Sequence, residues 1–190
     1  MIVDGLLLAA GAGSRMGRPK ALVVGDDGTS WLRASLGRLH DGGCRRVTVV
    51  LGAAADQAAA LLDGVDADVV VASEWAEGMS ASLRTGLAAL DPAADAVLVT
   101  LVDLPDVSAD VVRRVLAAAT GPDVLARAAY DGTPGHPVLI GRDHWAGVIA
   151  TATGDQGARD YLKPREVVHV ECGDLATGQD VDTPARTSDA

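Results

Sequence analysis

Residues 8–20 combine glycines with basic side chains, directly after the first apolar run of the chain. The glycines are Gly11, Gly13 and Gly17, and the cations are Arg15, Arg18 and Lys20. Glycines allow a loop to close its backbone N–H groups on an anion, and basic side chains strengthen the attraction. Such a cluster of cations is unusual in a chain whose formal net charge is −10. The segment therefore predicts a polyanion site, with a solvated glycine-rich turn as the alternative.

The glycine spacing distinguishes this loop from two common phosphate loops. The dinucleotide fingerprint needs G-x-G-x-x-G, whereas the third glycine here comes one residue later. The P-loop needs Ser or Thr after its lysine, but Ala21 follows Lys20. Backbone amides and a helix dipole usually hold a pyrophosphate, while a triphosphate with about four charges makes side-chain cations worthwhile. We therefore expect a nucleoside triphosphate rather than a nicotinamide dinucleotide.

Asp103 follows the apolar run of residues 96–102, where a buried strand is expected to end. Ligands of open α/β sheets bind in the crevice at the carboxyl ends of the strands. Mg²⁺ takes one or two carboxylates and keeps several waters, so Asp103 is its expected first ligand. Asp182 is the expected second ligand, and Asp180 is a weaker candidate. Turn formation is the alternative role for both Asp103 and Asp182.

Gly78, Ser80 and Ser82 lie where a helix over residues 79–90 is expected to begin. A helix start offers free N–H groups and the serines add two hydroxyls, so this segment suits the base and ribose of a nucleotide. Ordinary capping by Ser80 is the alternative. Arg84, one turn further along, either reaches a substrate phosphate or faces solvent.

His136, Asp155 and Arg159 form a third candidate set. His136 lies between Gly135 and Pro137 at an expected hairpin turn, where its neighbours fix the backbone. A structural role is the alternative for this single histidine. Arg159 either binds an acceptor phosphate or pairs with Asp155, four residues earlier on a helix.

Apolar runs rich in β-branched residues alternate with helical stretches, which predicts an α/β fold with a mostly parallel sheet. Expected strands cover residues 2–8, 47–51, 69–71, 96–102 and 167–170, with a hairpin over 124–130 and 137–140 that turns at residues 131–132. Expected helices cover residues 31–39, 56–62, 79–90, 111–119, 144–150 and 156–162. The parallel strands lack polar alternation, so we expect them to be buried between helices on both faces. Without a linker or repeat, residues 1–184 are expected to form one domain and residues 185–190 a frayed tail.

The composition excludes several kinds of partner. Asp and Glu number 26 against 16 Lys and Arg, so the surface repels nucleic acid and anionic membranes. No apolar run has the length of a membrane span, and no apolar leader follows a basic start, so we expect a cytoplasmic protein. Cys44 and Cys172 are then reduced, structural thiols. Aromatic residues are 3% of the chain and Phe is absent, so few rings can stack on bases. His40, His144 and His169 lack metal-ligand spacing and receive no role.

The loop reads Leu-Ala-Ala-Gly-x-Gly-x-Arg-Met-Gly-x-Pro-Lys and resembles the signature of Rossmann-like nucleotidyltransferases. Within the MobA-like family it is most similar to the molybdenum cofactor cytidylyltransferases. Further motifs extend this resemblance along nearly the whole chain, at residues 77–87, 135–137, 154–159 and 180–184. Two positions depart from the family pattern. The family usually has Gly before the strand-end Asp and often Gln or Met after it, whereas this chain has Val102 and Leu104.

The resemblance implies a Rossmann-like three-layer α/β/α fold with a small β-hairpin insertion. The residues that it implies are, for catalysis, Arg15, Lys20 and Asp103; for Mg²⁺, Asp103 and Asp182; for the acceptor, His136, Asp155 and Arg159; and for the nucleotide, Leu8, Ala9, Ala10, Gly11, Gly13, Ser14, Arg15, Lys20, Gly78, Ser80 and Ser82.

The implied reaction is attack of an acceptor phosphate on the α-phosphorus of CTP, with release of pyrophosphate. Relatives that use CTP tend to carry Leu-Ala-Ala-Gly and those that use GTP Leu-Ala-Gly-Gly, so Ala10 favours CTP. The implied acceptor is molybdopterin carrying molybdenum, and a molybdenum hydroxylase or its chaperone would receive the product. The nearer alternative is a related enzyme that uses GTP or another nucleotide, or a sugar or alcohol phosphate acceptor. The more distant alternative is a non-catalytic nucleotide-binding module.

Overall fold

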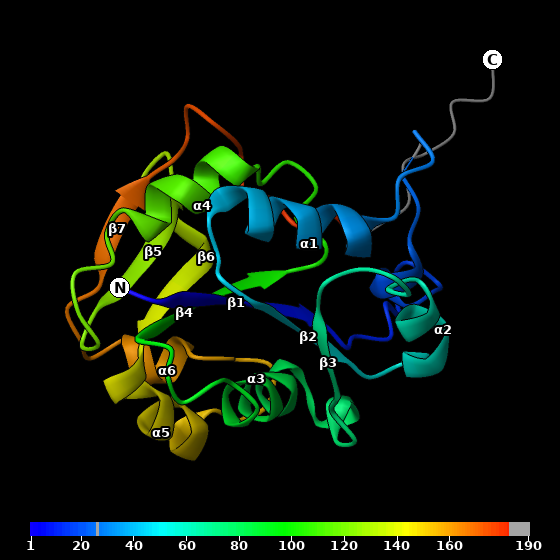
Figure 1. The fold of residues 1–190 in the computed structure, drawn as a ribbon, viewed down its shortest axis with the longest axis horizontal. Coiled ribbons are helices and arrows are strands. Elements are labelled where there is room, and N and C mark those ends of the chain that lie inside the picture. The colour runs from blue at the N-terminus through cyan, green and yellow to red at the C-terminus, as the bar shows by residue number, and fades with distance from the viewer. Residues whose placement is uncertain (26, 183–190) are drawn as a thin grey trace.

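A computed structural model describes residues 1–25 and 27–182 of the chain. Its strands form one mostly parallel sheet with the order β3-β2-β1-β4-β6-β5-β7 (Figure 1). The strands are β1 (Val3–Ala9), β2 (Val47–Leu51), β3 (Asp68–Val71), β4 (Ala96–Leu101), β5 (Leu125–Tyr130), β6 (Thr133–Gly141) and β7 (Val168–Glu171). The helices are α1 (Trp31–Gly42), α2 (Ala55–Ala60), α3 (Met79–Ala88), α4 (Ala109–Leu116), α5 (Arg142–Thr151) and α6 (Arg159–Leu162), with short 3₁₀ turns η1 (Lys20–Leu22) and η2 (Trp75–Glu77).

Helices cover both faces of the sheet, which confirms the expected three-layer α/β/α fold. α1 and α4 pack together on one face, while α3, α5 and α6 lie on the other (Figure 1). Each face has its own core of mainly Ala, Val and Leu. None of the described helices combines the length and apolarity that a membrane crossing requires.

The central strands confirm the prediction of burial on both faces, but β3 does not. All seven positions of β1 and all five of β2 are buried. In β3, by contrast, Val69 is 40% exposed and Val71 57% exposed. β3 lies at the edge of the sheet and pairs only with β2, so its apolar run reflects strand propensity rather than a covered face.

The predicted hairpin is confirmed, but it belongs to the sheet and is not an insertion. β6 lies between β4 and β5 and is antiparallel to both. Asp131 and Gly132 make the turn with φ values of 50° and 78°, a conformation that Asn, Asp and Gly tolerate best. His136 therefore lies within β6 rather than at the turn, which corrects the sequence-based expectation.

The capping signals in the sequence predict the bounds of α1 well but those of α6 poorly. Ser30 caps α1 by accepting a hydrogen bond from the Arg33 amide, and Gly43 ends the helix with φ of 109°. The helix expected over residues 156–162 is only the four-residue α6, because the preceding residues form turns. Residues 183–190 lie outside the described part of the chain, so the structure does not address the expected tail.

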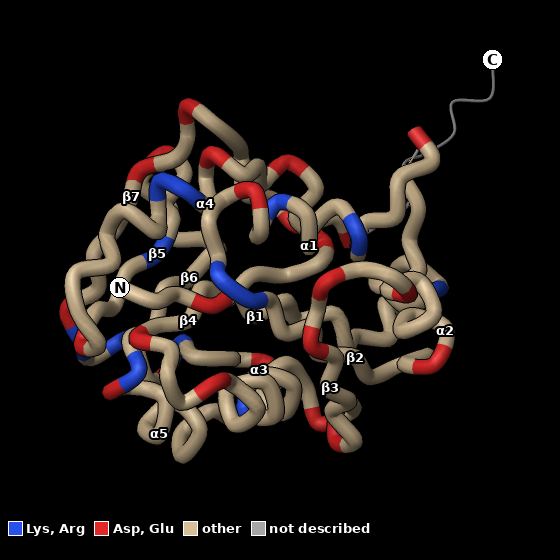
Figure 2. The backbone as a smooth tube through the Cα atoms, in the orientation of Figure 1, with Lys and Arg blue, Asp and Glu red and all other residues tan. Residues whose placement is uncertain are grey.

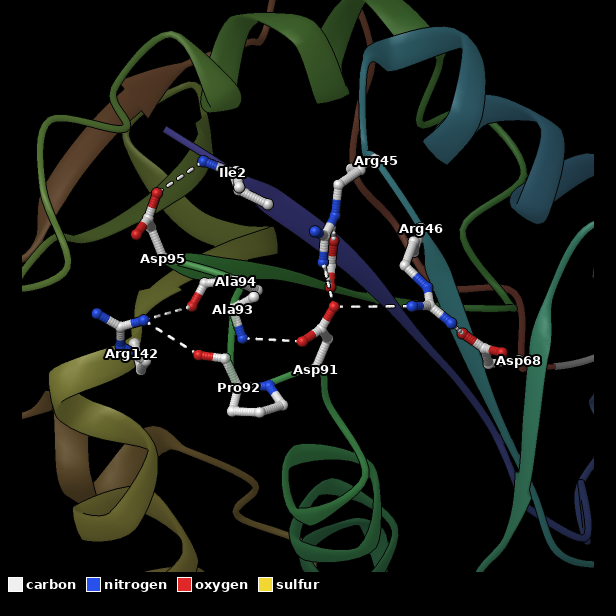
Figure 3. A network of polar contacts seen from close by, with 11 residues as sticks. Ile2, Arg45, Arg46, Asp68, Asp91, Pro92, Ala93, Ala94, Asp95 and Arg142 are labelled. Carbon is white, nitrogen blue, oxygen red and sulfur yellow. Dashed lines mark hydrogen bonds and ion pairs between the residues drawn. The ribbon is translucent and has the colours of Figure 1, made fainter.

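The amino ends of the parallel strands are joined by an ion-pair network. Acidic residues lie on loops all around the molecule (Figure 2), but Asp4 is an acidic residue inside β1, only 2% exposed. Arg45 binds both Asp4 carboxylate oxygens at 3.0 Å. It also reaches Asp91 at 2.9 Å (Figure 3). Arg46 pairs with Asp68 at 3.0 Å at the start of β3. This network closes the end of the sheet opposite the glycine-rich loop.

Candidate active site

A cleft of about 390 Å³ opens at the carboxyl ends of β1 and β4. Parallel pairing aligns Leu8 with Leu101, so the loop after β1 and the turn after β4 start side by side. The predicted nucleotide contacts line this cleft with the exception of Ser80. Asp103 and Asp182 line it as well. The topology thus brings residues near both ends of the chain to one crevice, where open α/β sheets bind ligands.

The loop after β1 needs glycine at particular positions. Gly13 has φ of +60°, and a Cβ atom there would lie 2.0 Å from the carbonyl oxygen of Arg18. The loop therefore folds back on itself at a point where only glycine fits. Gly17 also has a positive φ of +70°, but open space surrounds it. Arg18 is exposed and does not line the cleft, unlike Arg15 and Lys20.

Lys20 and Arg15 converge on the carboxylates that were predicted to face them. The Lys20 ammonium group contacts Asp103 Oδ2 and lies 2.6 Å from Asp182 Oδ1. Arg15 Nη1 lies 2.6 Å from Asp182 Oδ2. The Lys20 and Asp103 side chains are only 17% and 11% exposed, so this pair is held in a poorly solvated place. The four charged groups form one compact cluster, hereafter the charge cluster.

The contacts within the charge cluster favour the ionised forms of Lys20 and Asp182. Burial alone lowers the pKa of Lys20, but the hydrogen bonds and charges of Asp103 and Asp182 outweigh it and raise that pKa. The Lys20 hydrogen bond lowers the pKa of Asp182, and the charges of Lys20 and Arg15 add to this effect. Lys20 and Asp182 therefore present charges of opposite sign to the cleft at neutral pH.

Two carboxylates that line the cleft, Asp103 and Asp182, and the exposed Asp180 beside them fit a divalent cation. Asp103, Asp180 and Asp182 each offer an oxygen atom within 4.8 Å of the others. The Val181 amide donates to the Asp103 carbonyl at 3.0 Å, which fixes the segment with Asp180 and Asp182 against the end of β4. Asp103 Oδ1 is buried without a hydrogen-bond partner among the described residues. An unpartnered buried carboxylate oxygen is costly unless a cation or water occupies it, and hard cations prefer such oxygens.

The two departures from the family pattern are both accommodated in the core. Val102 and Leu104 are each 4% exposed and belong to the core on the α1 side of the sheet. Val102 also lines the cleft beside Asp103. The backbone that carries Asp103 is thus anchored on both sides by apolar packing.

The start of α3 lies across the cleft, but Ser80 does not face it. Ser80 is fully buried, and its hydroxyl accepts a hydrogen bond from the Gly157 amide at 3.0 Å. The predicted nucleotide contact of Ser80 is therefore wrong, and so is capping by Ser80, because Gly78 holds the N-cap position. A buried hydroxyl must find a partner, and here that partner is the loop before α6. Ser82 is 4% exposed and does line the cleft.

Asp155 and Arg159 do not form the helical pair that was considered for them. Asp155 Oδ1 accepts from the Met79 amide at 3.2 Å, at the start of α3. Arg159 Nη1 donates to Gln156 at 3.2 Å. Arg84 does not line the cleft; its side chain is 28% exposed, donates to the Ala152 carbonyl at 2.8 Å and pairs with Glu77 at 3.3 Å.

A second, smaller cavity of about 110 Å³ adjoins the cleft and shares Leu8, Met79 and Asp155 with it. The predicted acceptor residues His136 and Arg159 line this cavity. Most of its other lining side chains are apolar and come from α3, β4, β6 and α6, whereas Gln156 adds a polar group.

Arg127, on β5, also lines the smaller cavity and was missed from the sequence. Its Nε and Nη2 donate to the Gly135 carbonyl at 3.2 and 3.0 Å, and no described carboxylate pairs with it. Burial lowers the pKa of Arg127, and the charge of Arg159 lowers it further. Burial, together with the Arg127 charge, also lowers the pKa of His136 to about 4. An arginine inside an apolar strand was the available signal, because a half-buried guanidinium without a carboxylate partner favours an anionic ligand.

Comparison with known proteins places this architecture in a family. Over 191 residues the chain is 38% identical to the nicotine blue oxidoreductase of Paenarthrobacter nicotinovorans, covering 95% of this chain and 92% of that protein. That name denotes an oxidoreductase, a different reaction class from nucleotidyl transfer.

Solved structures agree with the fold. The crystal structure of Rv0371c from Mycobacterium tuberculosis H37Rv is 29% identical, with a TM-score of 0.79, over 96% of this chain and 94% of that one. A complex of Rv0371c with manganese matches with a TM-score of 0.78 and 26% identity, over 95% of this chain and 94% of that one. A nucleotidyl transferase from Methanothermobacter thermautotroptrophicus (Mth528), at 23% identity, shares the fold with a TM-score of 0.82 over 96% of this chain and 92% of that one.

The sequence model of the MobA-like NTP transferase domain matches residues 5–170, which span the loop after β1, Asp103 and the smaller cavity. The chain therefore belongs to the MobA-like NTP transferase family of nucleotidyltransferases.

Proposed function

We propose that this protein transfers CMP from CTP to the terminal phosphate of molybdopterin carrying molybdenum, with release of pyrophosphate. The observation that carries the proposal is the charge cluster, in which Lys20 and Arg15 meet Asp103 and Asp182 beside a glycine-shaped loop. Such a site offers cations to a polyanion and carboxylates to its counter-ion in one crevice. Few ligands other than a polyanion with a bound metal cation need basic side chains and carboxylates in the same crevice.

The reaction needs positioning and charge neutralisation more than proton transfer. An oxygen of the acceptor phosphate attacks the α-phosphorus of CTP, a new P–O bond forms, and the bond to the β-phosphate oxygen breaks to release pyrophosphate. The acceptor phosphate is already anionic near neutral pH, so no general base is required. The loop amides, Arg15 and Lys20 hold the triphosphate in the attack geometry and stabilise the charge that moves to the leaving group.

We propose Mg²⁺ as the divalent cation, held by Asp103 and Asp182, with Asp180 as a further oxygen donor. When bound, the cation supplies positive charge that screens the repulsion between donor and acceptor phosphates. The buried, unpartnered Asp103 Oδ1 supports a ligand role for this residue. Lys20 holds the other oxygen of the same carboxylate and so orients it.

The choice of CTP rests on Ala10. Its side chain is 4% exposed and lines the cleft. A methyl group at this position narrows the space for a base, which favours a pyrimidine over a larger purine. An Ala10→Gly variant should therefore use GTP better relative to CTP than the unmodified protein does.

The smaller cavity supports an anionic acceptor. Arg127 and Arg159 bring two guanidinium groups to it, and His136 remains neutral at pH 7. Asp155 lies at the boundary between the cavity and the cleft. An acceptor that fills this cavity with an anionic group can present its phosphate to the cleft. We further propose that the protein acts in the cytoplasm and hands its product to a molybdenum hydroxylase or the chaperone of one.

The relative in Paenarthrobacter favours an oxidoreductase as the second candidate function, because it shares 38% identity across most of both chains. The glycine spacing of the loop argues against this alternative, since it lacks the dinucleotide fingerprint. A carboxylate–lysine cluster is also not needed for hydride transfer.

A pyrophosphate-release assay tests the proposal. The protein is incubated with Mg²⁺, molybdopterin and each of the four ribonucleoside triphosphates, with sugar 1-phosphates as alternative acceptors. We expect release with CTP and molybdopterin that depends on Mg²⁺. Release with GTP, or with a sugar phosphate, would correct the base or the acceptor. Oxidation of NADH or NADPH without pyrophosphate release from any nucleotide would favour the oxidoreductase.

A further inference from the structure

The cleft contains an aromatic side chain at the end away from the charge cluster. The chain has three Trp, two Tyr and no Phe. Trp75, in η2, is the aromatic residue among the described cleft-lining residues. It is partly exposed and lines the cleft, and it also packs against the core on the α3 side of the sheet. No motif in the sequence pointed to it.

Close packing fixes the position of Trp75. A Cβ atom on Gly52 would lie 2.6 Å from Trp75 Cβ and 2.8 Å from Ala10 Cβ. Only glycine at position 52 therefore allows Trp75 and Ala10 to approach the strand end together. The Trp75 amide donates to the Ala72 carbonyl at 3.2 Å, and the Ala53 amide donates to the Ala10 carbonyl at 2.9 Å. Because the backbone and Cβ atom of Trp75 are held in this way, the indole ring can act as a preorganised wall of the cleft.

The strand order separates Trp75 from the charge cluster by about the distance that separates the base of a nucleotide from its phosphates. Asp103 follows β4, the glycine-rich loop follows β1, Gly52 follows β2, and η2 with Trp75 comes after β3. β4 and β2 flank β1, so the charge cluster and the Gly52–Trp75 contact are separated by about two strand spacings, roughly 10 Å. A nucleoside triphosphate has this polarity, with anionic oxygens at one end and an uncharged ring at the other. The cleft has the same polarity.

We propose that Trp75 is the stacking platform for the base of the bound nucleoside triphosphate, and that Ala10 and Gly52 hold this platform in place. This inference rests on the proposed function only in taking a nucleoside triphosphate as the ligand. An indole face stacks on any nucleobase, so Trp75 contributes affinity, while the width set by Ala10 contributes selectivity.

Tryptophan fluorescence gives the first test. Titration with CTP and Mg²⁺ should quench part of the emission, because the base covers the Trp75 ring. Inorganic tripolyphosphate should bind without this quenching, since it has no base. The matched control is Trp31→Phe, because Trp31 does not line the cleft and its loss should leave the quenching in place. Unchanged emission upon saturation with CTP would overturn the proposal.

Calorimetric titration of two variants gives the second test. Trp75→Leu should weaken CTP binding roughly 10- to 100-fold, the loss expected from removing one base–aromatic stack. Trp75→Phe keeps a ring and should bind CTP within a few-fold of the unmodified protein. Tripolyphosphate affinity should be equal in all three proteins, which also shows that the variants are folded.

The outcomes separate this inference from the proposed function. Equal CTP affinity in Trp75→Leu and the unmodified protein overturns the platform, even if pyrophosphate release confirms the transferase. Conversely, selective loss of CTP affinity in Trp75→Leu supports the platform even where no acceptor yields pyrophosphate. Weakening of tripolyphosphate and CTP by the same factor means that Trp75 shapes the loop rather than contacting the base, and also overturns the proposal.

Discussion

Lys20 contacts the carboxylates of Asp103 and Asp182. Under the proposed function, phosphate oxygens would add to the partners of the Lys20 ammonium group, and a divalent cation would take the unpartnered Oδ1 of Asp103. The bound phosphates and the bound cation would then carry opposite charges next to each other inside a poorly solvated crevice. Binding of the nucleotide and binding of the cation should therefore favour each other.

Replacement of Lys20 tests the importance of this residue for turnover. Lys20→Ala should lower the rate of pyrophosphate release by about 10²- to 10³-fold, the usual effect of removing one preorganised stabilising group. Steady-state kinetics with CTP and molybdopterin measure the effect. Arg18→Ala is the matched control, because Arg18 lies in the same loop, is exposed and does not line the cleft. Unchanged turnover in Lys20→Ala would remove Lys20 from the catalytic set.

Replacement of Asp103 tests the cation site without any need for a substrate. Asp103→Asn should weaken Mn²⁺ binding by at least about 10-fold, because the site loses a negative charge and its buried oxygen donor. Electron paramagnetic resonance titration of free Mn²⁺ measures the affinity. Asp110→Asn serves as the control, since Asp110 is an exposed carboxylate on α4. Equal affinities in the two variants would place the cation elsewhere.

At the scale of elements, the loop after β1 depends on Gly13 for its backbone path. The sequence pointed to this glycine only as one of several that could let the loop bind an anion. Gly13 and Gly17 both have positive φ values, but only at Gly13 would a Cβ meet backbone, at 2.0 Å from the Arg18 carbonyl. Gly17→Ala should thus cost about 1–2 kcal/mol of unfolding free energy for its backbone conformation alone. Gly13→Ala should cost more and should also weaken tripolyphosphate binding, because the loop must open. Urea unfolding measures the stability of the Gly13→Ala and Gly17→Ala variants, and calorimetry measures their tripolyphosphate affinity. Equal losses in the two variants would contradict the close contact at Gly13.

The network at the amino ends of the strands carries a stability prediction. Arg45→Met leaves the buried Asp4 carboxylate without its partner, which should lower the unfolding free energy by about 2–3 kcal/mol. This range is below that of a fully buried pair because the Arg45 side chain is 36% exposed. Arg46→Met is the control and should cost less than about 1 kcal/mol, since Arg46 and Asp68 are both 53% exposed. Urea unfolding measures the free energy of unfolding of both variants. Equal losses in Arg45→Met and Arg46→Met would contradict the greater importance of the Arg45–Asp4 pair.

Elements were predictable from the sequence where the signal is local. Continuous apolar runs identified the central strands, and Asp131-Gly132 identified the hairpin turn. The exposure of β3 was not predictable, because a run of valines has the same pattern at the edge of a sheet as at its centre. The buried role of Ser80 was also hidden, since its partner Gly157 is 77 residues away.

At the scale of the whole molecule, the chain order predicts which strand ends approach each other but not which side chains meet. Lys20 and Asp103 were expected to meet because both follow parallel strands with a familiar motif. Arg127 and His136 come from β5 and β6, and Arg159 from α6, so their convergence depends on the antiparallel position of β6 in the sheet. The nearness of the exposed Asp180 carboxylate to Asp103 was hard to predict for a similar reason, because it depends on the backbone hydrogen bond from Val181 to Asp103.

His136 couples the smaller cavity to the acid stability of the whole molecule. Burial lowers its pKa in the folded protein to about 4, whereas the ordinary value is 6.5. Between these values the unfolded chain binds the proton and the folded protein does not, so unfolding is favoured as the pH falls. The stabilisation is complete above about pH 6.5 and is lost progressively toward pH 4, and between pH 7 and pH 5 the loss should reach about 2 kcal/mol.

Urea unfolding at pH 7 and pH 5 isolates this contribution from that of the carboxylates, which titrate in every variant. His136→Gln and His136→Leu cannot take up the proton, so each should lose about 2 kcal/mol less than the unmodified protein over this interval. His169→Gln should behave like the unmodified protein, because His169 is exposed on β7. An equal loss in all four proteins would mean that His136 is protonated in the folded state. The smaller cavity would then carry a third cation at pH 5, and anion binding there should tighten with acid instead of staying constant.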